Sequence, residues 1–272
     1  MKTREAVLQS VYATAFLPHL ILVGTVHRDP RGYDKLFSLL TALRPDIISI
    51  ELSPYGRGFR TRNSRKLVQR LLFLYHAARP HNHLSDSFLS GDKDNRQPVH
   101  LTEDELKMLP SLLLELLATI RFPFEYETAR DYAKTCKVPL YCIDLSFISR
   151  KRLRLFREEA LTEANITMLL SLPDKGVQES VNLCYKRARA AWNEFPRDRR
   201  AGKESTGAAG DERDVHMSRR IINLLQKHPG KRILHLGGWE HCAGGIGTIN
   251  LYHMLREFSP LRVLLDEDFL KT

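Results

Sequence analysis

The segment Leu-Ile-Leu-Val-Gly-Thr-Val-His, residues 20–27, decides the fold that this sequence predicts. Its first four residues are apolar without interruption, which is typical of a strand buried on both faces of a parallel sheet. An amphipathic helix is expected over residues 33–43, and a second apolar strand over residues 46–51. Strand, helix and strand in this order predict a parallel β-α-β unit.

Further apolar runs at residues 138–143 and 232–236 extend the pattern. We therefore expect a single α/β domain over residues 1–272, with a central parallel or mixed sheet and helices on both faces. The sequence also predicts a helical insertion at about residues 55–135. A stretch almost without large apolar residues predicts a mobile loop at about residues 194–212.

Composition restricts the classes of protein to consider. The chain has 272 residues, of which 43% are hydrophobic, enough for a sizeable core. No apolar run approaches the roughly 18 residues that a membrane-spanning helix needs. The N-terminal segment has neither a proper apolar core nor a small-residue cleavage site, so no signal peptide is expected. These features predict a cytoplasmic protein without a membrane span.

The formal net charge of +10 raises the question of an anionic partner. The basic residues concentrate in four stretches, Arg60–Arg70, Arg150–Arg157, Lys186–Arg189 and Arg197–Lys203. These stretches contain few of the aromatic residues that stack on nucleic-acid bases. We therefore interpret most of them as solvated helix faces, and nucleic-acid binding stays as an alternative.

The pattern Gly-x-x-His occurs twice, at residues 24–27 and at residues 238–241. Each copy follows an apolar strand, and the carboxyl ends of parallel strands form one edge of a sheet. His27 and His241 are therefore expected to converge on one metal or substrate. The alternative for either histidine alone is a surface or helix-capping role.

Two carboxylates follow other predicted strands at the same edge. Glu51 ends the second strand, and Asp144 ends the third. A carboxylate in such a position must be hydrogen-bonded, paired or metal-bound, because burying it alone is costly. For Glu51 the structural alternative is a salt bridge to Arg57 or another arginine. Two histidines and one carboxylate also suffice to bind a divalent metal with positions left open for water.

Four segments in order resemble a known family. They are Gly-Thr-Val-His at residues 24–27, Pro-Asp-Ile-Ile-Ser-Ile-Glu-Leu at residues 45–52, Glu-Arg-Asp-Val-His-Met at residues 212–217, and Gly-Trp-Glu-His at residues 238–241. This order is similar to that of the TraB/PrgY, GumN and TIKI superfamily. The family commonly has an arginine a few residues after the glutamate, which Arg57 matches.

The resemblance implies a metal-dependent hydrolase-like α/β fold, related to the erythromycin-esterase and ChaN-like proteins. TIKI-type members are regarded as metalloproteases that use the two Gly-x-x-His histidines and the strand-end glutamate. Carried to this sequence, that implies His27, Glu51 and His241 as the site, with Arg213 as a supporting group. Asp144 is followed by leucine, where the family often has arginine.

The leading hypothesis is thus a metal-dependent hydrolase that acts on a peptide or amide bond. His27 and His241 would bind or orient a divalent ion (Mn, Co, Zn or Fe), and Glu51 would be a ligand of this ion or the general base. Arg213 would clamp the substrate or transition state. Arg57 and Asp144 are the candidate substrate-binding residues. The alternatives are a non-catalytic protein that binds a peptide or small molecule in the same crevice, and a basic nucleic-acid-binding protein. The sequence leaves the oligomeric state open.

Overall fold

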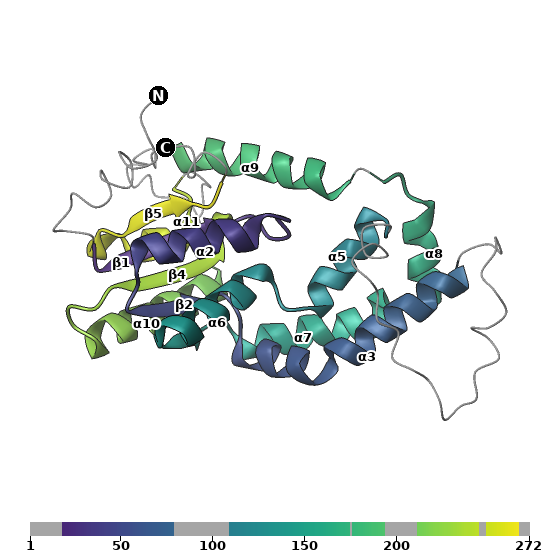
Figure 1. Cartoon of the computed structure of the whole chain (residues 1–272), viewed down its shortest axis with the longest axis horizontal. Coiled ribbons are helices and arrows are strands. Elements are labelled where there is room, and N and C mark those ends of the chain that lie inside the picture. Colours follow the sequence, from purple (N-terminus) through teal and green to yellow (C-terminus); the bar gives the residue numbers. More distant parts are fainter. Residues whose placement is uncertain (1–17, 79–108, 175, 194–210, 245–248, 267–272) are drawn as a thin grey trace, which may run out of the picture. The chain divides into compact units, whose positions relative to one another are not determined.

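The computed structural model describes residues 18–78, 109–174, 176–193, 211–244 and 249–266 (Figure 1). The chain divides into two compact units. The first unit takes in residues up to 54, residues 123–146 and residues from 178 onward, and the second takes in residues 55–122 and 147–177.

The first unit is built on a five-stranded sheet in which every neighbouring pair of strands is parallel. The strand order is β3-β2-β4-β1-β5. The strands are β1 (Leu20–Thr25), β2 (Ile47–Ile50), β3 (Leu140–Cys142), β4 (Ile233–Gly238) and β5 (Leu261–Leu264). The α/β class predicted from the sequence is thereby confirmed, and the sheet is parallel.

Helices cover both faces of this sheet because its central strands are apolar on both sides. Leu20 and Leu22 of β1 pack in one core with Ile221 of α10 (Glu212–Lys227). The side chains between them point to the opposite face. There α2 (Gly32–Leu43) packs against α6 (Phe124–Cys136). The remaining helices of this unit are α9 (Val177–Asn193), α11 (Trp239–Cys242), α12 (Leu251–Met254) and the 3₁₀ turn Arg256–Phe258.

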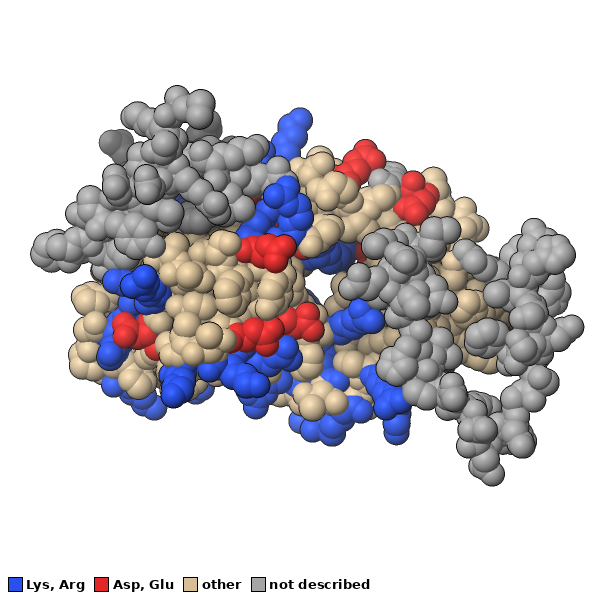
Figure 2. All heavy atoms as spheres, viewed as in Figure 1, with Lys and Arg blue, Asp and Glu red and all other residues tan. Residues whose placement is uncertain are grey.

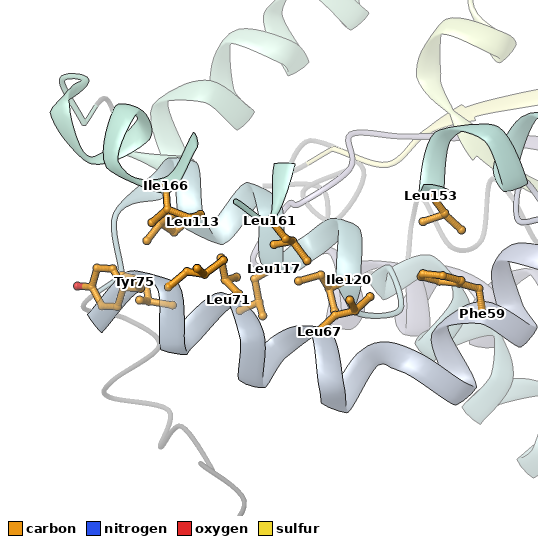
Figure 3. Close-up of a cluster of buried hydrophobic side chains, with 12 residues drawn as sticks. Phe59, Leu67, Leu71, Tyr75, Leu113, Leu117, Ile120, Leu153, Leu161 and Ile166 are labelled. Atoms are coloured by element: carbon orange, nitrogen blue, oxygen red, sulfur yellow. The ribbon is translucent and has the colours of Figure 1, made fainter. Parts of the chain in front are cut away.

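The second unit is helical and has its own core (Figure 3). Its elements are α3 (Pro54–Ala78), α5 (Ser111–Ile120), α7 (Ser146–Leu155), the π-helical turn Phe156–Ala160 and α8 (Glu163–Ser171). Leu67 and Leu71 lie on the inner face of α3 and pack with Leu113 and Leu117 of α5. Five apolar residues of α3 are thus buried in the core of this unit: Phe59, Leu67, Leu71, Leu74 and Tyr75.

One feature differs in detail from the sequence-based expectations. The helical unit is built from two segments, and α6, which falls inside the expected insertion at about residues 55–135, belongs to the sheet unit instead. The loop expected at about residues 194–212 lies almost wholly outside the described residues. Among the helices of the described ranges, none is long and apolar enough to cross a membrane.

Candidate functional site

Strand register brings the predicted site residues to one edge of the sheet. Thr25 pairs with Gly238, so the two Gly-x-x-His segments leave neighbouring strands β1 and β4 at the same level. Strand β2 lies on the other side of β4, and Glu51 follows it directly. Asp144 comes two residues after β3, which pairs with β2. All four segments therefore end together, as expected for parallel strands.

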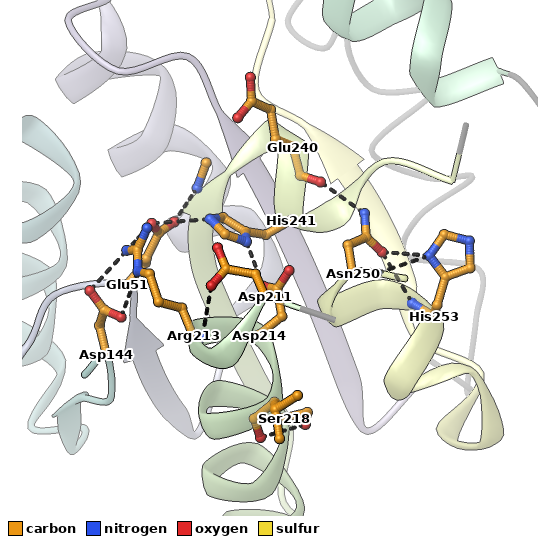
Figure 4. Close-up of polar contacts among 12 residues, drawn as sticks. Glu51, Asp144, Asp211, Arg213, Asp214, Ser218, Glu240, His241, Asn250 and His253 are labelled. Atoms are coloured by element: carbon orange, nitrogen blue, oxygen red, sulfur yellow. Dashed lines mark hydrogen bonds and ion pairs between the residues drawn. The ribbon is translucent and has the colours of Figure 1, made fainter. Parts of the chain in front are cut away.

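Glu51 is the centre of the polar network at this edge (Figure 4). Its Oε2 accepts a 2.7 Å hydrogen bond from the backbone N–H of Gly238. Its Oε1 accepts a 2.6 Å bond from Nη2 of Arg213 and lies 3.2 Å from Nε2 of His241. Burial by itself would raise the pKa of Glu51, but the His241 hydrogen bond and the charges of His241, His27 and Arg213 hold it well below its usual range.

Arg213 joins two of the strand-end carboxylates. It lies in the first turn of α10, where Asp211 caps the helix by accepting from the Arg213 N–H at 3.0 Å. Its guanidinium donates from Nε and Nη2 to the two oxygens of Asp144 at 3.0 and 2.8 Å. The same Nη2 reaches Glu51. The side chain thus lies at the sheet edge, instead of pairing with Glu212 as a surface residue.

Asp144 uses both carboxylate oxygens within the protein. Besides the two contacts from Arg213, its Oδ1 accepts a 2.7 Å hydrogen bond from the backbone N–H of Leu145. The substrate-binding role expected for Asp144 stays a prediction. In this structure Asp144 binds the Arg213 guanidinium and so holds it beside Glu51.

Each histidine of the two Gly-x-x-His segments is held at Nδ1 by a buried carboxylate. His27 Nδ1 lies 2.7 Å from Glu125 Oε1, which also accepts from the Thr25 hydroxyl at 2.7 Å. His241 Nδ1 lies 2.5 Å from Asp214 Oδ1. The side chains of Glu125 and Asp214 are only 4% and 5% exposed. Both imidazoles therefore keep Nε2 for contacts at the sheet edge.

The carboxylates raise the pKa of both histidines. For His27, loss of hydration lowers the pKa, but Glu125 outweighs it and raises the value to about 9. For His241, loss of hydration is likewise outweighed, here by Asp214 and Glu51, and the pKa rises to about 10. The negative charge of these carboxylates thus favours the protonated form of both imidazole rings.

The three residues predicted as metal ligands surround one point beside Gly238. A Cβ atom built on this glycine would lie 3.2 Å from His27 Nε2, 3.5 Å from Glu51 Oε2 and 3.7 Å from His241 Cδ2. The side chain of His27 is 54% exposed. Glycine keeps the space between the three side chains open.

Two polar atoms near the network are buried without a hydrogen-bond partner. One is Glu125 Oε2, and the other is Nε2 of His235, a fully buried histidine in the middle of β4. His235 Nδ1 lies 3.1 Å from the Ser49 hydroxyl, and burial lowers its pKa to about 4, so the ring is neutral. A Cβ on Gly237 would lie 3.2 Å from both His235 Nε2 and Glu51 Oε2.

Sequence reasoning did not name Glu125, Asp214 or His235 as site residues. Glu125 and Asp214 both lie in the first turn of a helix, where an acidic residue is ordinary. The signal for His235 was present, because a histidine inside the apolar strand Ile233–Leu236 needs a polar neighbour.

Arg57 is the one predicted site residue that lies in the helical unit. It is exposed and sits in the first turns of α3. Its expected role in substrate binding stays a prediction. The alternative for Glu51, a salt bridge to Arg57 or another arginine, is present with Arg213 at 2.6 Å.

Across the described ranges, no group of three or more His, Cys, Asp or Glu side chains has an arrangement that could hold a metal ion as it stands.

The chain matches no protein-family model, no curated protein and no solved structure in the comparisons made.

Proposed function

We propose that this edge of the sheet is the centre of a metal-dependent hydrolase of the TraB/TIKI type, acting on a peptide or amide bond. His27, Glu51 and His241 would hold the ion. The observation that carries the proposal is that both histidines are fixed at Nδ1 by a buried carboxylate. Metal-binding histidines almost always have such a partner, which sets the tautomer and aims Nε2 at the ion.

The charges of the site support a cation. Among the described residues the network contains four carboxylates and one guanidinium: Arg213 contacts Glu51 and Asp144, while Glu125 contacts His27 and Asp214 contacts His241. With neutral histidines this leaves three negative charges in a mostly buried network, and such charge is costly unless it is compensated. A divalent ion coordinated by two imidazoles and a carboxylate supplies that compensation.

The donor types of the proposed ligands, two imidazoles and a carboxylate, suit such an ion, and binding would replace the present contact between His241 and Glu51. His241 Nε2 now lies 3.2 Å from Glu51 Oε1, and both atoms are donors that a divalent metal accepts. Mn, Co, Zn and Fe all accept two imidazoles with a carboxylate. When bound, the ion would lower the pKa of a water molecule and polarise the scissile carbonyl.

The residues of the chain have distinct tasks in this proposal. Arg213 fixes the Glu51 carboxylate and places positive charge beside the reacting carbonyl, where it would stabilise a developing oxyanion. Glu125 and Asp214 keep the two imidazole rings in position. The exposed side of His27 leaves the approach of a substrate open.

Metal content is the direct test. Plasma mass spectrometry should find about one equivalent of Mn, Co, Zn or Fe in the wild type, and a loss of this metal in the His27→Ala/His241→Ala double variant. His216→Ala is the matched control, because His216 lies on α10 outside the network. Equal metal content in all three proteins would remove the metal from the proposal.

Turnover is tested separately with libraries of peptides and esters. Hydrolysis by the metal-loaded wild type, lost in Glu51→Gln, is the expected result. Tight peptide binding without turnover would favour the alternative of a non-catalytic binding protein that uses the same crevice.

A further inference from the structure

The helical unit carries a basic surface on α3. In 25 residues this helix has six Arg or Lys side chains and no Asp or Glu. Arg62, Arg65, Lys66 and Arg70 fall on one side, since they are spaced by three, four or eight residues. Figure 2 shows Lys and Arg side chains gathered where Figure 1 places this helix. Its apolar side faces the core of the same unit, so the basic side faces solvent.

An aromatic ring lies within this basic side. Phe73 follows Lys66 by seven residues and Arg62 by eleven, which is two and three helical turns. Its side chain does not join the core to which Leu71 and Leu74 contribute, and the residue is 70% exposed. Among the described residues of this unit, the exposed ring of Phe73 has no place in the core, and we take it as a contact point for a partner.

The same combination occurs on α7. This helix has four Arg or Lys and no Asp or Glu, and Phe147 in its first turn is 71% exposed. Arg150 and Lys151 follow Phe147 by three and four residues, so the ring and the charges share a face. Phe73 lies three residues after the basic stretch that ends at Arg70, and Phe147 lies three residues before the one that begins at Arg150. Helical periodicity places each ring on the same face as the basic side chains.

We propose that the basic face of α3, with Phe73 at its C-terminal end, binds single-stranded nucleic acid. Guanidinium groups, which are five of the six cations on α3, match phosphate oxygens in a bidentate manner. The spacing from Arg62 to Phe73 corresponds to about 16 Å along the helix, room for a few nucleotides. Aromatic side chains within a basic groove are how sequence-tolerant single-strand binding works.

Other anionic partners fit this face less well. A helix that lies in a membrane surface inserts a broad apolar side, whereas the apolar side of α3 is buried in its own unit. In duplex nucleic acid the bases are stacked on one another, so Phe73 would have no base face to contact. An unstacked strand offers both the phosphates and the base faces.

Fluorescence anisotropy with labelled 20-nucleotide oligo-U and oligo-dT tests the proposal on the full-length protein. Comparison of the two affinities shows whether the protein prefers RNA or DNA. We expect binding that weakens steeply with salt. Arg62→Ala/Lys66→Ala should reduce the slope of log affinity against log salt by about 1.4, since each phosphate contact on a single strand contributes about 0.7. Phe73→Ala should weaken binding about fivefold or more, with the slope unchanged.

The control is Arg219→Ala/Arg220→Ala, which removes the same charge from exposed positions on α10. It should leave both affinity and slope unchanged. The proposal is overturned if neither oligonucleotide binds, if Phe73→Ala binds as well as the wild type, or if the α10 variant weakens binding as much as the α3 variant. Tighter binding to phosphatidylserine vesicles than to either oligonucleotide would also overturn it. The altered side chains are exposed, and circular dichroism verifies that each variant folds.

Discussion

At the scale of single residues, Asp214 is the most informative side chain to change. It contacts His241 Nδ1 and has no place in the proposed ion's coordination, so it acts by positioning the ring. Asp214→Asn keeps the side-chain volume but removes the charge, and we expect it to lower metal affinity by about 10-fold to 100-fold. Competition titration with Co²⁺ or Zn²⁺ measures the change. Glu212→Gln, on the same helical turn but exposed, should bind metal as the wild type does, and equal affinity in both variants would contradict the assigned role.

Arg213 is the residue on which stability depends most directly. Its side chain is 12% exposed and is the guanidinium shared by Glu51 and Asp144, which are 8% and 7% exposed. Arg213→Ala leaves two buried carboxylates close together, and we expect it to lower the free energy of unfolding by about 3–5 kcal/mol. Urea unfolding provides the measurement. The exposed Arg219→Ala on the same helix should stay within about 0.5 kcal/mol of the wild type.

Part of this site could be predicted from the sequence, because functional side chains at the edge of a parallel sheet lie just after the ends of the strands. His27, Glu51 and His241 were identifiable since each follows an apolar run within five residues. Glu125 was not, because it reaches His27 from a helix about 100 residues away and looks like any acidic residue in a first turn. Long-range partners of this kind depend on helix placement, which local periodicity does not specify.

At the scale of elements, a buried cluster secures the loop between β1 and α2. Asp29 Oδ2 accepts a 2.7 Å bond from Lys35 of α2 and a 2.6 Å bond from the Tyr185 hydroxyl of α9. All three residues are at most 5% exposed. Because His27 lies two residues before Asp29, this cluster also positions the histidine.

The cluster predicts a pH dependence of stability. Burial by itself raises the pKa of Asp29, but hydrogen bonds from Lys35 and Tyr185 outweigh it, so the folded pKa lies below the ordinary value of 3.8. The stabilisation is therefore complete above about pH 4 and is lost as the pH falls through the folded value. Urea unfolding of wild type and Asp29→Asn should show a clear gap at pH 7 that narrows below pH 3. A gap of constant size would show that Asp29 does not titrate in this way.

Helix α3 shows what the sequence conveyed about elements and what it did not. Its basic run was recognised as helix-compatible, and the leucines after it as apolar. The position of Phe73 on the charged side follows only once the helix is known to continue unbroken from Pro54 to Ala78. Likewise, α6 was expected in the helical insertion because it follows a helical stretch, yet its packing partner is α2 of the sheet unit.

At the scale of the whole molecule, each of the two units has a hydrophobic core among its described residues, and the sheet edge with its polar network belongs to the sheet unit. Leu117→Ala removes a buried side chain from the helical unit, and Met217→Ala does so beneath the sheet. Each should destabilise its own unit by about 2–5 kcal/mol. Hydrogen exchange followed by mass spectrometry should show faster exchange in α3, α5 and α8 for Leu117→Ala, with β1 and β4 unchanged, and the reverse for Met217→Ala. Equal acceleration of exchange in both sets of elements would show that the two cores form one cooperative unit. In that case a substitution on the basic face of α3 would also change the stability of the sheet unit that contains Glu51.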